Sequence, residues 1–152
     1  MASVIRRLVS RSRDDKGAEL IEFAVVLPIF LVVFAAMCDF GFMFERYEVV
    51  TNAAREGARL AMLSTYTVAD VQARVQNYLT DSGLTASAPP ADVTYSNETL
   101  PSGLIVRVVT VTVEYPTQFF LMQPFAGLIG GSAPGTVTLR AASVMRVEAA
   151  GT

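Results

Sequence analysis

The sequence contains no histidine, no tryptophan and a single cysteine among its 152 residues. Without histidine, the catalytic triads and dyads that use an imidazole base are excluded, and so is a metal site built from histidine and cysteine clusters. The single cysteine excludes an intramolecular disulfide, so any globular part must be stabilised by packing alone. The acidic residues are scattered and form no paired-carboxylate signature. We therefore expect no enzymatic activity, no cofactor and no metal.

Charge is absent where the chain is most apolar. Residues 23–38 contain no charged side chain, and Asp39 is the only charged residue before Glu45. As a helix, residues 23–44 would extend roughly 33 Å, which matches the hydrocarbon thickness of a bilayer. The sequence therefore predicts a single transmembrane helix, with membrane lipid as a partner.

The charged residues are distributed unevenly around this span. Residues 1–16 hold five basic and two acidic side chains, a net charge of +3, and the rest of the chain holds −5, which together give −2. The positive-inside rule then predicts a cytoplasmic N-terminus and a periplasmic or extracellular head. No nucleic-acid partner is expected, because no basic groove with interleaved aromatic residues follows the basic leader.

A basic leader before an apolar run is also typical of secretory signals. Cleavage near Ala35 would release a small secreted domain, but Glu22 and Pro28 are unusual inside such a signal. Lipidation would use Cys38, and the bulky Met37 before it disfavours that outcome.

In a third outcome the helix is retained and only the leader is removed. A cut after Gly17 would make Ala18 the first residue and Glu22 the fifth. This arrangement resembles the type IV prepilin signal, which implies that Glu22 pairs with the free amine of a neighbouring subunit. A carboxylate at the centre of a bilayer costs up to ~2.5–3.5 kcal/mol, so a charge partner would explain why it is there. The simpler alternative is that Glu22 reaches the aqueous interface.

Four short motifs occur in order between Gly17 and Arg59. They are Gly17-Ala18 with Glu22-Phe23, Leu27-Pro28, Asp39-Phe40-Gly41, and Asn52-Ala53-Ala54-Arg55-Glu56-Gly57-Ala58-Arg59. Together they closely resemble the TadE-like family of the tight-adherence (Flp, type IVb) pilus system of bacteria. The resemblance implies a minor pseudopilin in the inner membrane, trimmed by a prepilin peptidase. Its other implied partners are Tad pilus subunits and the inner-membrane platform; TadE and its paralogue TadF are not distinguished.

Two other functions remain open. The span can be a simple tether for an extracytoplasmic binding module, or the head can be a secreted domain released from a signal. The first residue of the mature protein distinguishes the three hypotheses: Ala18 for the pseudopilin, Met1 for the tethered module, and a residue after Ala35 for the secreted domain.

The membrane helix is predicted to continue to Ala61, with a kink at Pro28. Ala53, Gly57 and Ala61 recur at intervals of four, which places small side chains on one face where another backbone can approach closely. That face either packs on the protein's own sheet or contacts another subunit. On the opposite face, Glu56 and Arg59 have the spacing of a solvated ion pair.

A second helix is predicted to begin at Thr67, where Asp70 completes a capping-box pattern, and to end at Gly83. Its apolar positions share one face: Val68, Val71, Val75 and Leu79. Strands are expected at residues 93–95, 104–115 and 136–148, with a bulge at Val108-Val109 where the alternation changes phase.

These elements predict an α+β fold. A long N-terminal transmembrane helix would extend into a small head that has a second helix and a three-stranded antiparallel sheet. The expected organisation is a basic cytoplasmic leader at 1–17, the transmembrane and extended helix at 18–62, and the extracytoplasmic head at 63–152.

The connection at 116–135 is too apolar for an ordinary solvent loop. Its large apolar residues include Phe119, Phe120, Phe125 and Leu128. Such a segment can cover the end of the core, enter the membrane surface or contact a partner subunit.

Overall fold

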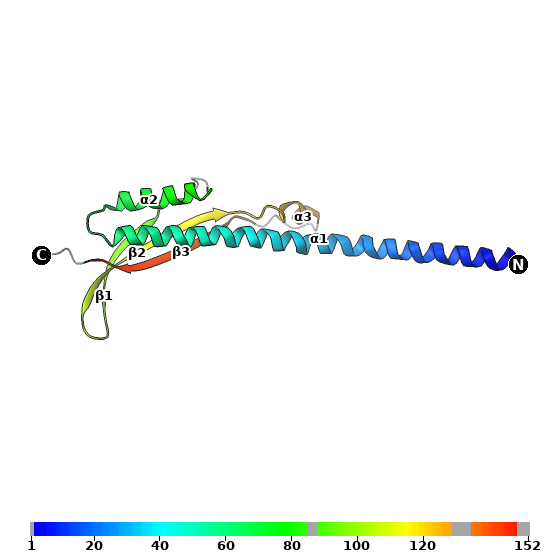
Figure 1. The fold of residues 1–152 in the computed structure, drawn as a ribbon, viewed down its shortest axis with the longest axis horizontal. Helices are drawn as coiled ribbons and strands as arrows, with labels where there is room; N and C mark the ends of the chain where they lie inside the picture. Colours follow the sequence, from blue (N-terminus) through cyan, green and yellow to red (C-terminus); the bar gives the residue numbers. More distant parts are fainter. Residues whose placement is uncertain (1, 85–87, 129–134, 149–152) are drawn as a thin grey trace. The chain divides into compact units, whose positions relative to one another are not determined.

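A computed structural model describes residues 2–84, 88–128 and 135–148 of the chain. Its first element, α1 (Ala2–Ala61), is a single 60-residue helix that continues through Pro28 (Figure 1). The chain forms two compact units, to which α1 contributes in turn. The span unit contains Met1–Asp39 and Phe120–Ala133, and the head unit contains Phe40–Phe119 and Pro134–Thr152.

The second helix, α2 (Val68–Asp81), begins at the predicted cap. The backbone N–H of Thr67 donates to the Asp70 carboxylate at 2.9 Å, and the N–H of Asp70 donates to the Thr67 hydroxyl at 3.3 Å. These reciprocal bonds satisfy N–H groups that the first turn leaves without helical partners. The helix ends before Gly83, whose φ of 81° is available to glycine at little cost.

Three antiparallel strands form one sheet in the order β1-β2-β3. They are β1 (Asp92–Thr99), β2 (Ile105–Thr117) and β3 (Val137–Arg146). The turn between β1 and β2 is closed by the Leu100 N–H, which donates to the Leu104 carbonyl at 2.8 Å. Together with α1 and α2, this sheet confirms the predicted α+β fold.

The predicted bulge at Val108-Val109 is wrong. Both ladders keep an unbroken register, in which Val108 lies opposite Ser96 on β1 and Arg146 on β3. The central strand β2 has a neighbour at each edge, and here it buries residues on both of its faces. Val109 faces the helices, and Val108 is only 6% exposed between its cross-strand neighbours. Two consecutive valines can therefore both be buried, on opposite faces of β2, without a bulge.

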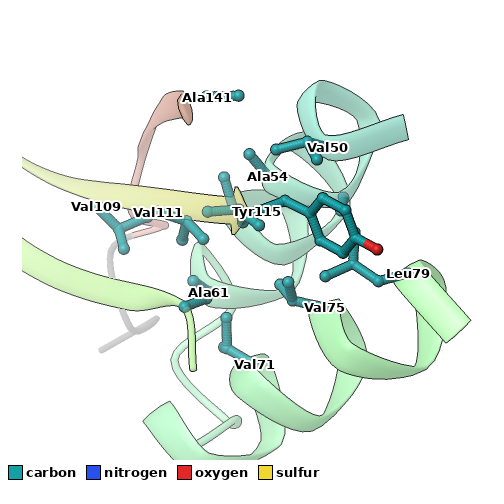
Figure 2. Packing of buried hydrophobic residues seen from close by; sticks show 14 of the residues in the cluster. Val50, Ala54, Ala61, Val71, Val75, Leu79, Val109, Val111, Tyr115 and Ala141 are labelled. Atoms are coloured by element: carbon teal, nitrogen blue, oxygen red, sulfur yellow. The ribbon is translucent and has the colours of Figure 1, made fainter. Parts of the chain in front are cut away.

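The core of the head unit lies between the helices and one face of the sheet (Figure 2). Beside the C-terminal part of α1, α2 presents Val71, Val75 and Leu79, each at most 2% exposed. The central strand contributes Val109, Val111 and Tyr115 from the other side. Close packing of this kind requires small residues on α1, because a helix axis approaches its neighbours most closely where side chains are short.

Candidate functional site

The N-terminal part of α1 exposes large apolar side chains. More than half of the residue surface is exposed at ten positions up to Met37: Leu20, Ile21, Phe23, Val25, Val26, Ile29, Phe30, Val33, Phe34 and Met37. This part of α1 belongs to the only helix, among the residues that the structure describes, that is long and apolar enough to cross a membrane. Such a surface is unfavourable in water and suited to lipid, so it is compatible with a membrane anchor.

The residues of the predicted processing site lie inside α1, just before this apolar surface. Gly17 is half-buried and Ala18 is exposed, and no atom lies within 4 Å of the position that a Cβ on Gly17 would occupy. Glu22 is also exposed. Among the side chains that the structure describes, none forms a hydrogen bond or ion pair with its carboxylate, so Glu22 is open to a partner outside the chain.

Asp39 connects two segments of the span unit that are far apart in the sequence, and sequence reasoning missed this role. Its side chain is only 4% exposed. The carboxylate accepts hydrogen bonds from three successive backbone N–H groups, those of Phe120 at 3.1 Å, Leu121 at 3.0 Å and Met122 at 2.8 Å. These donors immediately precede the short helix α3 (Gln123–Leu128). Asp39 therefore attaches the apolar segment to α1.

The other residues of the predicted apolar segment occupy different environments. In the head unit, Phe119 packs edge-on against Phe40, with ring centroids 6.3 Å apart. In the span unit, Phe120 is 77% exposed, Phe125 is half-buried and Leu128 is the last residue of α3. Residues 129–134, which complete the predicted segment apart from Gly135, lie outside the described residues.

Two small residues of the fourth motif, and Ala61 just after it, lie in the head core. Ala53, Gly57 and Ala61 are all buried. A Cβ added to Gly57 would lie 2.6 Å from Cγ2 of Val75 and 3.1 Å from Cγ1 of Val111. This face of α1 thus contacts α2 and β2 of its own head, which leaves no room there for another subunit.

The charged residues of the same motif connect α1 to α2. Arg59 donates from Nε and Nη2 to the Glu56 carboxylate at 3.0 and 2.9 Å. Arg74 on α2 donates from Nη2 to the same carboxylate at 2.9 Å. Hydrogen bonds from Arg59, and then from Arg74, lower the pKa of Glu56 to about 2. Glu56 is therefore ionised at neutral pH and crosslinks the two helices.

One surface hollow of the head unit, of ≈ 520 Å³, is lined by apolar residues: Phe40, Gly41, Met43, Phe44, Tyr47 and Leu139. In the part of the chain that the structure describes, no group of three histidine, cysteine, aspartate or glutamate residues is placed to bind a metal. The polar contacts found here connect parts of the protein to each other.

The comparison with known proteins agrees with the sequence motifs. The family model described as TadE-like protein matches residues 17–59. No curated protein and no solved structure matches the chain. The matched residues contain all four motifs. Over residues 17–59 the chain is therefore similar to the TadE-like family, and this similarity implies a Tad pilus-related protein.

Proposed function

We propose that the chain is a minor pseudopilin of a Tad pilus, anchored in the bacterial inner membrane and acting through contacts with other pilus subunits. The observation that carries the proposal is the TadE-like segment at residues 17–59, whose N-terminal part exposes large apolar side chains and Glu22 together. The basic leader at 1–17 lies in the cytoplasm, and the head at 63–152 lies across the membrane.

Processing after Gly17 fits the local physics of α1. A peptidase must open a helix before it can cut the backbone, and glycine lowers the local helix stability by roughly 0.5–1 kcal/mol relative to alanine. The prepilin peptidase is the proposed enzyme for this cut. The mature protein would then begin at Ala18, with a charged amine beside the apolar surface.

Glu22 is the proposed contact for a neighbouring subunit. Its carboxylate is exposed at the start of the apolar surface, where an unpaired charge would be costly in lipid. The free amine of Ala18 on a second subunit would neutralise that charge. The inner-membrane platform and other Tad subunits are the proposed surroundings in which this pairing occurs.

The test compares Glu22→Ala with Glu19→Ala at matched protein levels in cells that produce the pilus. Glu19 is an exposed acid three residues earlier, so its variant controls for the loss of one charge near the membrane. We expect Glu22→Ala to insert normally and to give severalfold fewer pili and fewer crosslinked subunits, while Glu19→Ala assembles normally. Equal, unimpaired assembly by both variants would exclude the pairing. The mature mass, measured in the same extract, shows separately whether Ala18 is the first residue.

A further inference from the structure

In a low-dielectric environment, the Asp39 carboxylate and the backbone N–H groups at the start of the apolar segment compensate each other. A carboxylate at the end of a membrane helix is costly unless hydrogen bonds compensate its charge. Backbone N–H groups outside a helix are equally costly in lipid unless they find an acceptor. The Asp39 carboxylate receives the N–H groups of Phe120, Leu121 and Met122 at 2.8–3.1 Å, which satisfies both sides. In water, solvent molecules would form these hydrogen bonds, so the carboxylate and the N–H groups would not need each other.

The hydrogen bonds also determine how deep in the bilayer the apolar segment would lie. Asp39 follows Phe23 by sixteen residues, which corresponds to about 24 Å along the helix, against about 30 Å for the hydrocarbon core. The backbone of residues 120–122 is therefore attached to α1 near the far boundary of the hydrocarbon. Ala35, one turn earlier on the same face as Asp39, is only 5% exposed, whereas Met37 on another face is 69% exposed. One face of α1 is thus covered at this level, and the others are not.

The attached segment directs apolar surface outward. Phe120 is 77% exposed, the largest exposed fraction among the described large apolar side chains. It is followed by Leu121, Met122 and the short helix α3 (Figure 1). Pro124 stands in the first turn of α3, where its missing N–H is not needed. No charged side chain occurs between Tyr115 and Arg140. A segment with this composition at this depth is suited to the boundary of a bilayer.

We propose that residues 120–128 are a second membrane contact: a short interfacial segment that Asp39 holds against the transmembrane helix, with Phe120 inserted among the lipid chains. Asp39 is a positioning residue in this arrangement, since lipid contacts the segment and not the carboxylate. The chain would then be held at the membrane by two elements far apart in the sequence. This contact does not depend on Glu22 or on pilus assembly.

The chain has no tryptophan, so a single introduced tryptophan reports on one position without background. We would place the full-length Phe120→Trp protein in vesicles of phosphatidylglycerol and phosphatidylcholine, with and without brominated acyl chains. Phe30→Trp, in the middle of the span, is the control for lipid contact. Val144→Trp, 56% exposed on β3 of the head, is the control for water. Phe120→Trp should emit at shorter wavelength than Val144→Trp and be quenched severalfold more strongly by the brominated lipid.

The positioning role of Asp39 is tested by adding a second substitution, at Asp39, to the Phe120→Trp protein. Asp39→Ala removes the acceptor, and it should shift the emission and the quenching toward those of Val144→Trp. Asp39→Asn retains one acceptor oxygen and should give an intermediate result. Unchanged quenching in both variants would contradict the positioning role of Asp39.

The Phe120→Trp protein with Asp39 intact decides the membrane contact even if the Asp39 variants do not fold. Emission and quenching equal to those of Val144→Trp would overturn the proposal, because Phe120 would then face water. Short-wavelength emission without quenching by brominated lipid would overturn it as well. That result would mean that protein covers Phe120, either a second copy or another part of the chain.

Discussion

The two parts of α1 are built from different side chains although they form one helix. Between Phe23 and Met37 the side chains are large, apolar and exposed. Between Val50 and Ala61 the apolar side chains at the core are small, and four of them are completely buried: Val50, Ala53, Ala54 and Ala58. These side chains are apolar in both parts, so their hydrophobic character does not distinguish the two parts. The two parts differ in the size of these side chains.

This difference is compatible with a membrane around the first part and the protein's own head around the second. Lipid fills any gap, so large side chains facing a bilayer need no complementary protein surface. In the head, α2 and β2 must approach α1 closely enough to exclude water, and at Gly57 even an added Cβ would lie 2.6 Å from Val75. The packed part also forms an ion pair with α2, between Glu56 and Arg74. The comparison predicts that the same kind of substitution has opposite consequences in the two parts.

Removing apolar volume should have the largest effect, and only in the head. Leu79 is 1% exposed in the core, so Leu79→Ala should lower the free energy of unfolding of the head by about 2–5 kcal/mol. Phe30→Ala removes more atoms, but Phe30 is 61% exposed in the span, and the stability of the head should not change. Hydrogen exchange of the β2 amides in detergent-solubilised protein measures this difference. Similar protection losses in both variants would contradict the separation of the two parts.

Much of this head could be predicted because its signals are local. The Thr67–Asp70 cap and the spacing of Val71, Val75 and Leu79 lie within one helix, and the structure confirms them. Val68 was expected on the same face but is 41% exposed, because it stands in the first turn at the edge of the apolar stripe.

The strands were predicted less completely. Beyond Tyr95, β1 continues to Thr99 through Ser96, Asn97 and Glu98, whose polar side chains carry no strand signal. These residues are extended because β2 supplies the pairing partners. At the other end, β2 continues past Pro116 to Thr117, where β1 no longer pairs with it. Proline is tolerated there because one side of the strand has no neighbour that needs its N–H.

Asp39 shows what a single sequence does not reveal. Its position in the motif Asp39-Phe40-Gly41 was recognised, but its hydrogen-bond donors lie 81–83 residues further along the chain. No periodicity or spacing connects residues at that separation. The short helix α3 was missed for a related reason, since six residues containing a proline and a glycine give no helical pattern.

Adding a single methyl group should have the next largest effect, and again in one part only. In Gly57→Ala the new Cβ would lie 2.6 Å from Cγ2 of Val75, and overpacking of this kind costs about 1–3 kcal/mol. That cost opposes the gain of about 1 kcal/mol that alanine brings to a helix, so we expect a net loss of stability. Gly41→Ala is the matched control on the same helix, because no atom lies within 4 Å of its added Cβ.

Urea unfolding of both variants in detergent measures the comparison. The midpoint of Gly57→Ala should fall below that of the unmodified protein, and the midpoint of Gly41→Ala should stay the same or rise. A Gly57→Ala protein as stable as Gly41→Ala would mean that the helices and the sheet separate easily, and that small residues are not needed there.

The smallest expected effect concerns the ionic link between α1 and α2. The pKa of Glu56 is lowered from 4.5 to about 2 in the folded head, chiefly by hydrogen bonds from Arg59 and Arg74. A lowered pKa means that the unfolded chain binds the proton first as the pH falls. The stabilisation from Glu56 is therefore complete above about pH 4.5, decreases through the window below it, and is lost near pH 2. Glu56→Gln should cost about 1 kcal/mol at pH 7, since both arginines are largely exposed.

The pH dependence separates this ionic contribution from a packing effect. The difference between the unmodified protein and Glu56→Gln should shrink as the pH is lowered from 5 toward 2, because protonation removes the same charge that the substitution removes. Glu114→Gln is the control: Glu114 and Arg140 lie 3.5 Å apart, 45% and 69% exposed, and their pair should contribute almost nothing at any pH. The lowered pKa of Asp70, due to bonds from Thr67, leaves some acid sensitivity in both variants. If the Glu56→Gln difference were equally large at pH 2 and pH 7, the link between the helices would depend on the shape of the side chain and not on its charge.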